Sequence, residues 1–365
     1  MADTRHWKSE LPLVWILFAA GGAWLACSLA AGSQLYAEDN GAEWSAPRCE
    51  VTPVADQQVV FSIDGVEKTR WHFGNNYPRP FFYPFNGPSG ETLTRMGHPG
   101  APDHDHHQSI WFAHNKVDGL DFWGNGHQSE IRQKQWLCFQ DGSSEGIMAV
   151  LLGWYAADGR ELMEQQVVAG IMPVEDGQSN GGSKHAAEHG LEIQFTLRPA
   201  AGIDAVALDK TNFGFLAVRV AKGISAAFGN GELNNSEGAV GESECFAKPA
   251  RWMDYSGPVA ARQPGSEGER QARSEGITFF DHPSNPRYPT HWHVRNDGWM
   301  GAAYGLQEAH RLTAAEPLTL RYFLFAHREG YDAIKAQRVA DQFAQRPAYQ
   351  VVRAERGNLQ FEVKR

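Results

Sequence analysis

The stretch Gln58–Phe73 reads QVVFSIDGVEKTRWHF and indicates the fold. Its first part, Gln58–Ile63, is rich in β-branched and aromatic residues, and Val66–Phe73 resumes that pattern after Asp64-Gly65. Asp and Gly tolerate the positive φ angles that a tight hairpin turn requires. The stretch therefore predicts two antiparallel strands joined by a two-residue turn.

Similar signals continue along the chain. Aspartyl-glycine pairs recur near strand-like runs, at Asp118-Gly119, Asp141-Gly142, Asp158-Gly159, Asp176-Gly177 and Asp297-Gly298. Further strands are expected at Ile147–Tyr155, Leu191–Arg198, Phe213–Val220, Ile277–Phe280 and Leu318–Phe325. Apolar and polar residues alternate in Leu191–Leu197, which predicts one solvent-facing side. We predict an all-β fold, a large antiparallel β-sandwich.

Helical signal is scarce, so we expect only one or two peripheral helices. Small and apolar residues repeat at helical spacing within Tyr331–Ala344, which predicts one helix beside the sheets. Two polar, glycine-rich stretches, Gly177–Gly190 and Gly257–Gly276, are interpreted as long surface loops.

The N-terminus indicates export. Leu11–Ala31 contains no charged residue and follows a start that carries Arg5 and Lys8. This pattern fits a secretory signal cut after Ala30 or nearby, and an uncleaved membrane anchor is the alternative, because about twenty apolar residues can cross a bilayer. We predict a signal peptide or anchor at 1–31, a flexible segment at 32–50, a single β domain at 51–365, and a periplasmic or extracellular location. Any membrane contact would come through the N-terminal segment.

Composition narrows the class of ligand. The formal net charge of -10 excludes the basic footprint of a nucleic-acid-binding protein. Aromatic residues make up 12% of the chain, and such a surplus suits carbohydrates, whose apolar faces stack on rings. Three cysteines follow the leader, Cys49, Cys138 and Cys245, so the mature chain can form at most one disulfide.

Two histidine-rich stretches are the main functional signal. The first lies between Gly97 and Gly126 and the second within Asp281–His293. In extended chain, residues two apart share a face, so the pairs His104/His106 and His291/His293 could converge. We predict catalytic roles for His106, His107, His114, His293, Glu232 and Glu237. One imidazolium, His106 or His107, would act as the acid, and His293, Glu232 or Glu237 as the base.

Aromatic, amide and cationic side chains nearby are predicted to bind the substrate. They are Trp111, Trp123, Lys210, Arg219, Asn234, His282, Asn285, Arg287 and Trp292. A purely structural role is the alternative for some of these residues. Tryptophans also fill cores, and Lys210 and Arg219 could form salt bridges. His98, which precedes a proline in a turn, is expected to be exposed.

Four runs carry a resemblance to a known family: RPFFYPFNGPSG, PDHDHHQSIWFAHNKVDGLDFWG, RWMDYSG and FDHPSNPRYPTHWHVR. They resemble the PmoA-like family of secreted bacterial proteins, often labelled methane oxygenase, over about Phe61–Arg328. The membrane monooxygenase subunit of that name spans the bilayer several times, whereas this chain has one predicted leader. The resemblance therefore implies membership of a largely uncharacterised family, and not methane chemistry. It also implies a fold similar to the galactose-mutarotase-like supersandwich. Thr211-Asn212 stands where that resemblance leads us to expect an acidic residue.

Three functions compete. The first is an exported carbohydrate-active enzyme without a cofactor, of epimerase, lyase or hydrolase type, acting on a sugar or sugar derivative. The second is a metal-dependent enzyme with His104, His106, His291 and His293 as ligands of Zn, Cu or Fe. The third is a glycan-binding protein without catalytic activity.

Overall fold

The computed structural model describes residues 45–101, 104–126, 128–174, 188–262, 268–355 and 357–365. The chain divides into two units, Met1–Ser45 and Ala46–Arg365, and every element named below belongs to the second. The predicted leader lies outside the described residues. Cys49 and Glu50, expected in the flexible segment, begin the first strand instead. Within the described ranges, no helix is long and apolar enough to cross a membrane.

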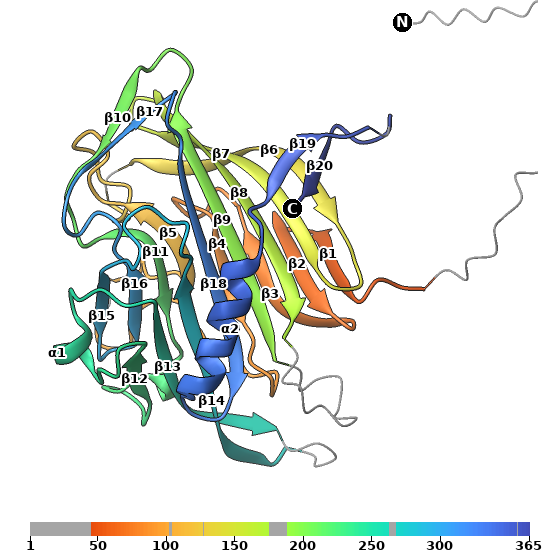
Figure 1. Cartoon of the computed structure of the whole chain (residues 1–365), viewed down its shortest axis with the longest axis vertical. Helices are drawn as coiled ribbons and strands as arrows, with labels where there is room; N and C mark the ends of the chain where they lie inside the picture. Colours follow the sequence, from red (N-terminus) through yellow and green to blue (C-terminus); the bar gives the residue numbers. More distant parts are fainter. Residues whose placement is uncertain (1–44, 102–103, 127, 175–187, 263–267, 356) are drawn as a thin grey trace, which may run out of the picture. The chain divides into compact units, whose positions relative to one another are not determined.

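Two eight-stranded antiparallel sheets make up the fold (Figure 1). The first sheet contains, in spatial order, β1 (Cys49–Val54), β2 (Gln58–Ile63), β3 (Val66–His72), β4 (Phe81–Phe85), β5 (Ile110–His114), β11 (Gly214–Arg219), β16 (Trp299–Ala302) and β15 (Trp292–Arg295). The second contains β12 (Glu232–Asn235), β13 (Trp252–Arg262), β14 (Arg270–Asp281), β18 (Leu318–Arg328), β9 (His189–Pro199), β8 (Glu161–Pro173), β7 (Gly146–Tyr155) and β6 (Glu130–Gln140). The predicted all-β sandwich is confirmed.

Smaller elements complete the fold. Two short hairpins pair β10 (Ala205–Leu208) with β17 (His310–Thr313) and β19 (Gln350–Arg353) with β20 (Phe361–Lys364). Three short or peripheral helices are a 3-10 turn (Lys222–Ile224), α1 (Glu242–Cys245) and α2 (Ala333–Gln345). The predicted helix is confirmed as α2, and the Asp332 side chain caps it by accepting hydrogen bonds from the backbone N–H of Ile334 and Lys335.

The core lies between the two large sheets. Aromatic rings meet there from both sides: Phe112 of β5 packs on Phe195 of β9 with ring centroids 4.9 Å apart. At the edge of the first sheet, Trp292 of β15 packs on Phe279 of β14, also at 4.9 Å. Alternate residues of each strand therefore divide between this core and the outer face of their sheet.

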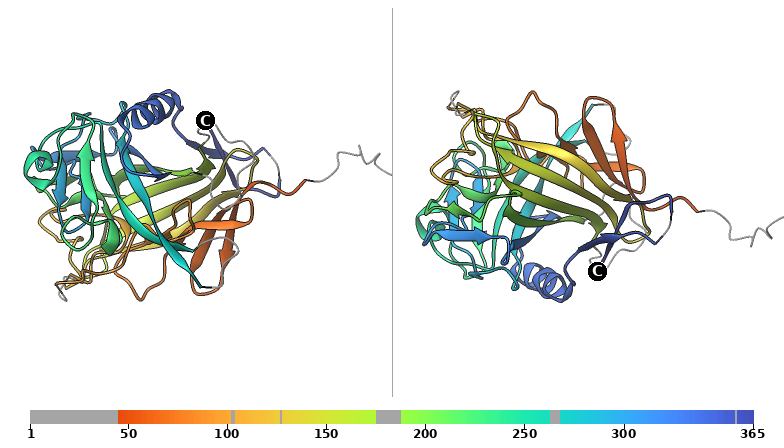
Figure 2. Two further views of the ribbon diagram at one scale, coloured as in Figure 1. Left: turned by 90° about the horizontal axis from the view of Figure 1, so that it is seen from below. Right: turned by 90° about the horizontal axis from the view of Figure 1, so that it is seen from above.

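Part of the outer face of the second sheet is covered rather than exposed to solvent. Helix α2 lies against it (Figure 2) and buries Phe343 with Phe323 of β18. The prediction of one solvent-facing side for Leu191–Leu197 is wrong, because Glu192 is fully buried. Its carboxylate accepts hydrogen bonds from the guanidinium groups of Arg321, Arg346 and Arg365, which come from later parts of the chain.

One predicted hairpin is confirmed, and one predicted loop is wrong. The hairpin of β2 and β3 forms as predicted, with Asp64 and Gly65 at φ angles of 52° and 74°. The predicted loop Gly257–Gly276 is wrong, because its two described parts extend β13 and β14 into a long polar hairpin. The first five residues of β14 are exposed, so that this part lacks the apolar alternation by which strands are recognised. The other predicted loop lies mostly outside the described residues.

The three cysteines in the described part of the chain, Cys49, Cys138 and Cys245, are unpaired. Cys49 and Cys245 are buried, and burial raises the pKa of each thiol to about 11. Disulfides therefore do not hold the described fold together.

Candidate functional site

Strand register gathers the candidate site on the outer face of the first sheet. Trp111 of β5 lies opposite Ala217 of β11, and Arg219 of the same strand lies opposite Trp299 of β16. His293 of β15 pairs with Gly301, two residues after Trp299, so its side chain shares this face. The four side chains therefore point away from the second sheet.

A cleft of about 430 Å³ opens over this face. It is lined by His104, His106, His107, Asn115, Asp121, Trp123, Gly124, Asn212, Phe213, Arg219, Phe246, His293, Arg295, Asp297 and Trp299. The lining joins three members of the first histidine stretch to His293 of the second. The convergence of the two stretches is thus present in the fold, although only one member of the second takes part.

A chain of hydrogen bonds fixes the state of His107. Arg219 donates from one guanidinium nitrogen to His107 Nδ1 at 2.7 Å and from another to the carboxylate of Asp297. His98 Nε2 donates to the second oxygen of that carboxylate at 2.9 Å. Since Nδ1 of His107 accepts, its proton lies on Nε2. Burial, with the Arg219 charge second, holds the pKa of His107 far below its usual value, so the ring is neutral.

Asp297 is held as a carboxylate. Burial opposes its charge, but the Arg219 guanidinium and the hydrogen bond from His98 lower the pKa of Asp297 below its usual value. Arg219 itself is only 1% exposed and stacks over the Trp299 ring at 5.1 Å. Arg219 and Asp297 therefore form an ion pair that holds His107 in place.

His293 has the opposite arrangement of donor and acceptor. Its Nδ1 lies 3.1 Å from the backbone oxygen of Asn212, which can only accept, so Nδ1 carries the proton and Nε2 has a free lone pair. Burial lowers the pKa of His293 to about 4. The cleft therefore contains two neutral imidazoles, one with an Nε2–H donor and one with an Nε2 acceptor.

His106 is a third neutral imidazole. Burial first, then the charge of Arg79, lowers the pKa of His106 to about 4. Its ring centroid lies 4.4 Å from that of His107. His104 stacks beside His106 at 5.4 Å.

Aromatic rings form the walls and rim of the cleft. Trp299 and Trp123 lie 5.5 Å apart in the wall. Phe213 and Phe246 each pack edge-on against His293, and they keep 38% and 40% of their surface exposed. Exposed rings at the mouth of a cleft that also holds polar groups suit a ligand with both an apolar face and hydroxyls.

Several predicted site residues are structural instead. His114 is buried and donates from Nε2 to the backbone oxygen of Asp209 at 2.9 Å. Trp111 is fully buried below Trp299, and Trp292 lies in the core with its indole N–H on the oxygen of Ala250. These three side chains support the cleft without lining it.

The remaining predicted residues lie away from the cleft. Glu232 bonds Asn234 on β12, and Glu237 forms an exposed ion pair with Arg251. Lys210 is exposed outside the lining. Three residues of the second histidine-rich stretch hold the local fold together. His282 contacts Ser284 and Arg321, and Asn285 bonds Asp281 and Arg321. Arg287 donates to backbone oxygens. The carboxylates expected to act as bases are therefore not near the histidines.

The proposed metal ligands are only partly brought together. His104, His106 and His293 line the cleft, whereas His291 does not. Among the described residues, no group of three or more His, Cys, Asp or Glu side chains is placed to share a metal ion. The metal-dependent alternative stays a hypothesis, tested by the metal content of purified protein.

Sequence reasoning missed most of the polar partners in the cleft. Asp297 was interpreted only as part of an aspartyl-glycine turn, although it lies between His293 and Trp299 in the chain. Asn212 provides a backbone oxygen at the position where the family resemblance predicted an acid. Phe246 lies in none of the motifs, and Phe213 and Arg295 belong to a predicted strand and to a quoted run without being predicted as site residues. The spacing of Asp297 between a cluster histidine and a tryptophan was the one available signal.

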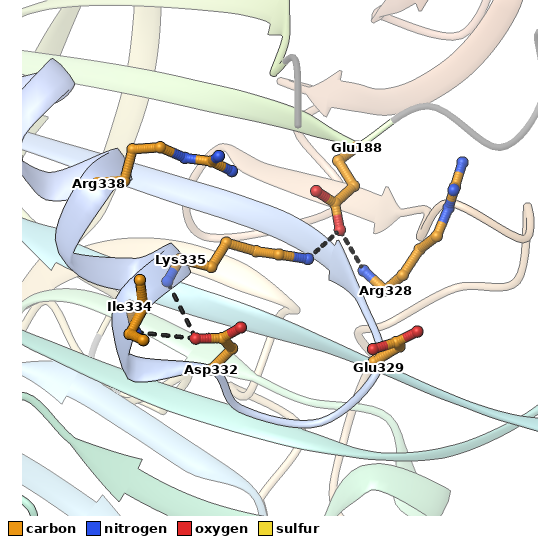
Figure 3. Close-up of a pocket in the computed structure, with 7 residues that line it drawn as sticks. All are labelled: Glu188, Arg328, Glu329, Asp332, Ile334, Lys335 and Arg338. Carbon is orange, nitrogen blue, oxygen red and sulfur yellow. Dashed lines mark hydrogen bonds and ion pairs between the residues drawn. The ribbon is translucent and has the colours of Figure 1, made fainter. Parts of the chain in front are cut away.

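A second cleft, of about 360 Å³, lies where β18 meets α2 (Figure 3). Several of its polar groups bond to one another or to the backbone: Lys335 and the backbone N–H of Arg328 donate to the same oxygen of Glu188, and Asp332 caps the helix. We assign it a structural role in fastening α2 to the sheet.

The fold and its cleft define an all-β sandwich protein with one histidine-rich site on an outer sheet face. The chain belongs to DUF6807, a family of unknown function, whose model matches residues 58–341. That match spans both histidine stretches and most strands of the two large sheets. No curated protein matches the chain. The resemblance to PmoA-like proteins stays a prediction.

Proposed function

We propose that the protein is an exported carbohydrate-active enzyme that acts on a sugar or sugar derivative through His107 and His293. The observation that carries this proposal is their complementary protonation in one cleft. His107 has its proton on Nε2 because Arg219 occupies Nδ1, and His293 has a lone pair on Nε2 because Asn212 occupies Nδ1. A hydroxyl-bearing ligand could engage a donor and an acceptor at once.

In the proposed reaction, His293 acts as the general base. It would take a proton from a hydroxyl, or from a carbon next to a carbonyl. His107 would donate a hydrogen bond to the oxygen on which negative charge develops. A neutral imidazole can fill this second role when its pKa is lowered, so the acid need not be an imidazolium. Proton transfers of the epimerase or elimination type fit these two groups better than strong acid catalysis does.

The aromatic rim supports a carbohydrate ligand. Phe213 and Phe246 offer apolar edges beside the base, and the Trp123 ring lies within reach of Phe213, at 5.9 Å. A sugar ring stacked there would have its hydroxyls directed to the imidazoles and to the amide of Asn115, which lines the same cleft.

The test is turnover by purified mature protein over a panel of mono- and oligosaccharides, including oxidised sugars. The His293→Gln variant should lose turnover and keep ligand binding, because the base is lost while the rim remains. His310→Gln is the matched control, since His310 is half-buried on β17 outside the cleft. Binding without turnover by wild-type protein would favour the glycan-binding alternative. No binding and no turnover would refute a carbohydrate function.

A further inference from the structure

We infer that the sugar unit bound at His107 and His293 carries no charge, because every cation that lines the cleft already has a carboxylate partner. The inference rests on the proposed function and narrows its substrate class to neutral sugars, as opposed to uronates and other sugar acids.

The first lining cation is Arg219. One of its guanidinium nitrogens bonds the carboxylate of Asp297, and another is committed to His107. With only 1% of its surface exposed, Arg219 cannot turn toward a ligand without breaking a buried ion pair. Breaking a buried ion pair on one side is strongly unfavourable, because it leaves an unpaired charge in the protein interior.

The second lining cation is Arg295. Its Nε lies 3.1 Å from a carboxylate oxygen of Glu242, the first residue of α1. The other oxygen of Glu242 accepts from the backbone N–H of Asn296 at 2.8 Å, which holds the carboxylate in place. Arg295 is thus paired with Glu242 at the edge of the cleft, although 55% of its side chain stays exposed.

Two more arginines lie close to the cleft without lining it. Arg79 is 1% exposed and donates to the backbone oxygens of Phe122 and Gly124. Arg95 donates to the backbone oxygens of Val220, Gly97 and Asp297. Their donors are directed to the protein itself, so neither provides a site for a ligand carboxylate.

The lining also contains carboxylates of its own. Asp121 joins Asp297, so carboxylates equal arginines among the charged lining residues, and Glu242 adds a further negative charge beside Arg295. His106 and His293 add no positive charge at neutral pH, since burial lowers the pKa of each to about 4. An anionic sugar would meet a lining whose arginines and carboxylates are equal in number, in a chain with a formal net charge of -10.

This electrostatic balance also bears on the reaction. Removing a proton next to a sugar carboxylate places a second negative charge on that group, which hydrogen-bond donors or a cation must stabilise. In the described cleft, the buried cation Arg219 is already committed to Asp297 and His107. Epimerisation, elimination or hydrolysis of an uncharged sugar therefore fits the site better than elimination from a uronate does.

The experiment is calorimetric titration of mature protein with matched pairs at low ionic strength: glucose and glucuronate, galactose and galacturonate, mannose and mannuronate. We expect at least one neutral member to bind and its uronate to bind about tenfold more weakly or worse. Equal or tighter binding of the uronate overturns the inference and leaves the proposed function standing. Binding of no sugar of either kind refutes the proposed function, and the inference falls with it.

A variant checks the electrostatic cause. Glu242→Gln removes the partner of Arg295, so uronate affinity should rise about threefold while neutral-sugar affinity is unchanged. Glu237→Gln is the matched control, because Glu237 also pairs with an exposed arginine, Arg251, but lies outside the cleft. No gain in Glu242→Gln, or the same gain in both variants, would contradict the assignment.

Discussion

Replacing Arg219 with methionine should weaken both the fold and the proposed site. Met keeps the apolar stem but removes the guanidinium that joins Asp297 to His107. The loss leaves the Asp297 carboxylate supported by His98 alone among its side-chain partners. It also removes the cation stacked on Trp299. Because His107 Nδ1 loses its donor, the proton is no longer confined to Nε2.

The size of the effect follows from burial. Removing one partner of a buried ion pair costs about 3 to 5 kcal/mol. Asp297 keeps 21% of its side chain exposed, so water can replace part of the lost contact, and the lower figure of about 3 kcal/mol is expected. Urea unfolding measures it as a shift of the midpoint at constant slope.

The control is Arg198→Gln, an exposed arginine on β9, which should change the free energy of unfolding by less than about 0.5 kcal/mol. Nitrogen-detected NMR of His107 gives the second readout: one tautomer in wild type and a mixture in Arg219→Met. A loss below about 1 kcal/mol together with an unchanged tautomer would refute the chain of contacts described here.

Three further predictions concern the base, the rim and the helix cap. The pKa of His293 is lowered to about 4, so this base is unprotonated at neutral pH, and kcat/KM should fall only as pH drops through about 4; an acidic limb near 6.5 in the pH profile would contradict this. Phe246→Ala should weaken sugar binding about fivefold by titration calorimetry, because one exposed ring of the rim is lost, and unchanged affinity would exclude the rim from the site. Asp332→Ala should lower the free energy of unfolding by about 1 kcal/mol in urea, since two backbone N–H groups at the start of α2 lose their acceptor; no loss would show that the cap adds nothing.

The strands could be predicted where their signals are local. The hairpin of β2 and β3 depends on alternation and on an aspartyl-glycine turn within one short stretch, and it forms as expected. The prediction that the polar face of Leu191–Leu197 is exposed was wrong because the partners of Glu192 are remote in sequence. Its carboxylate is buried under Arg321, Arg346 and Arg365, which come from later parts of the chain. Local patterns therefore predicted the strands but not which faces are covered.

The candidate site could likewise be predicted from the sequence only in part. The density of histidines directed attention to His106, His107 and His293, and the fold places them in one cleft. Glu232 and Glu237 were chosen as bases only because they lie between the two stretches in the chain, and they belong to a different sheet edge and its turn. Asp297 was overlooked because an aspartyl-glycine pair is explained by its turn alone.

The order of strands in the first sheet has a consequence for how the protein comes into action. Strand β11 lies between β5 and β16, so the cleft combines His107 from the first third of the chain with His293 and Asp297 from its final third. A chain emerging from the ribosome has the donor imidazole and Arg219 long before it has the base. If the proposed reaction takes place, its onset would therefore report that β16 and β15 have added to the sheet beside β11.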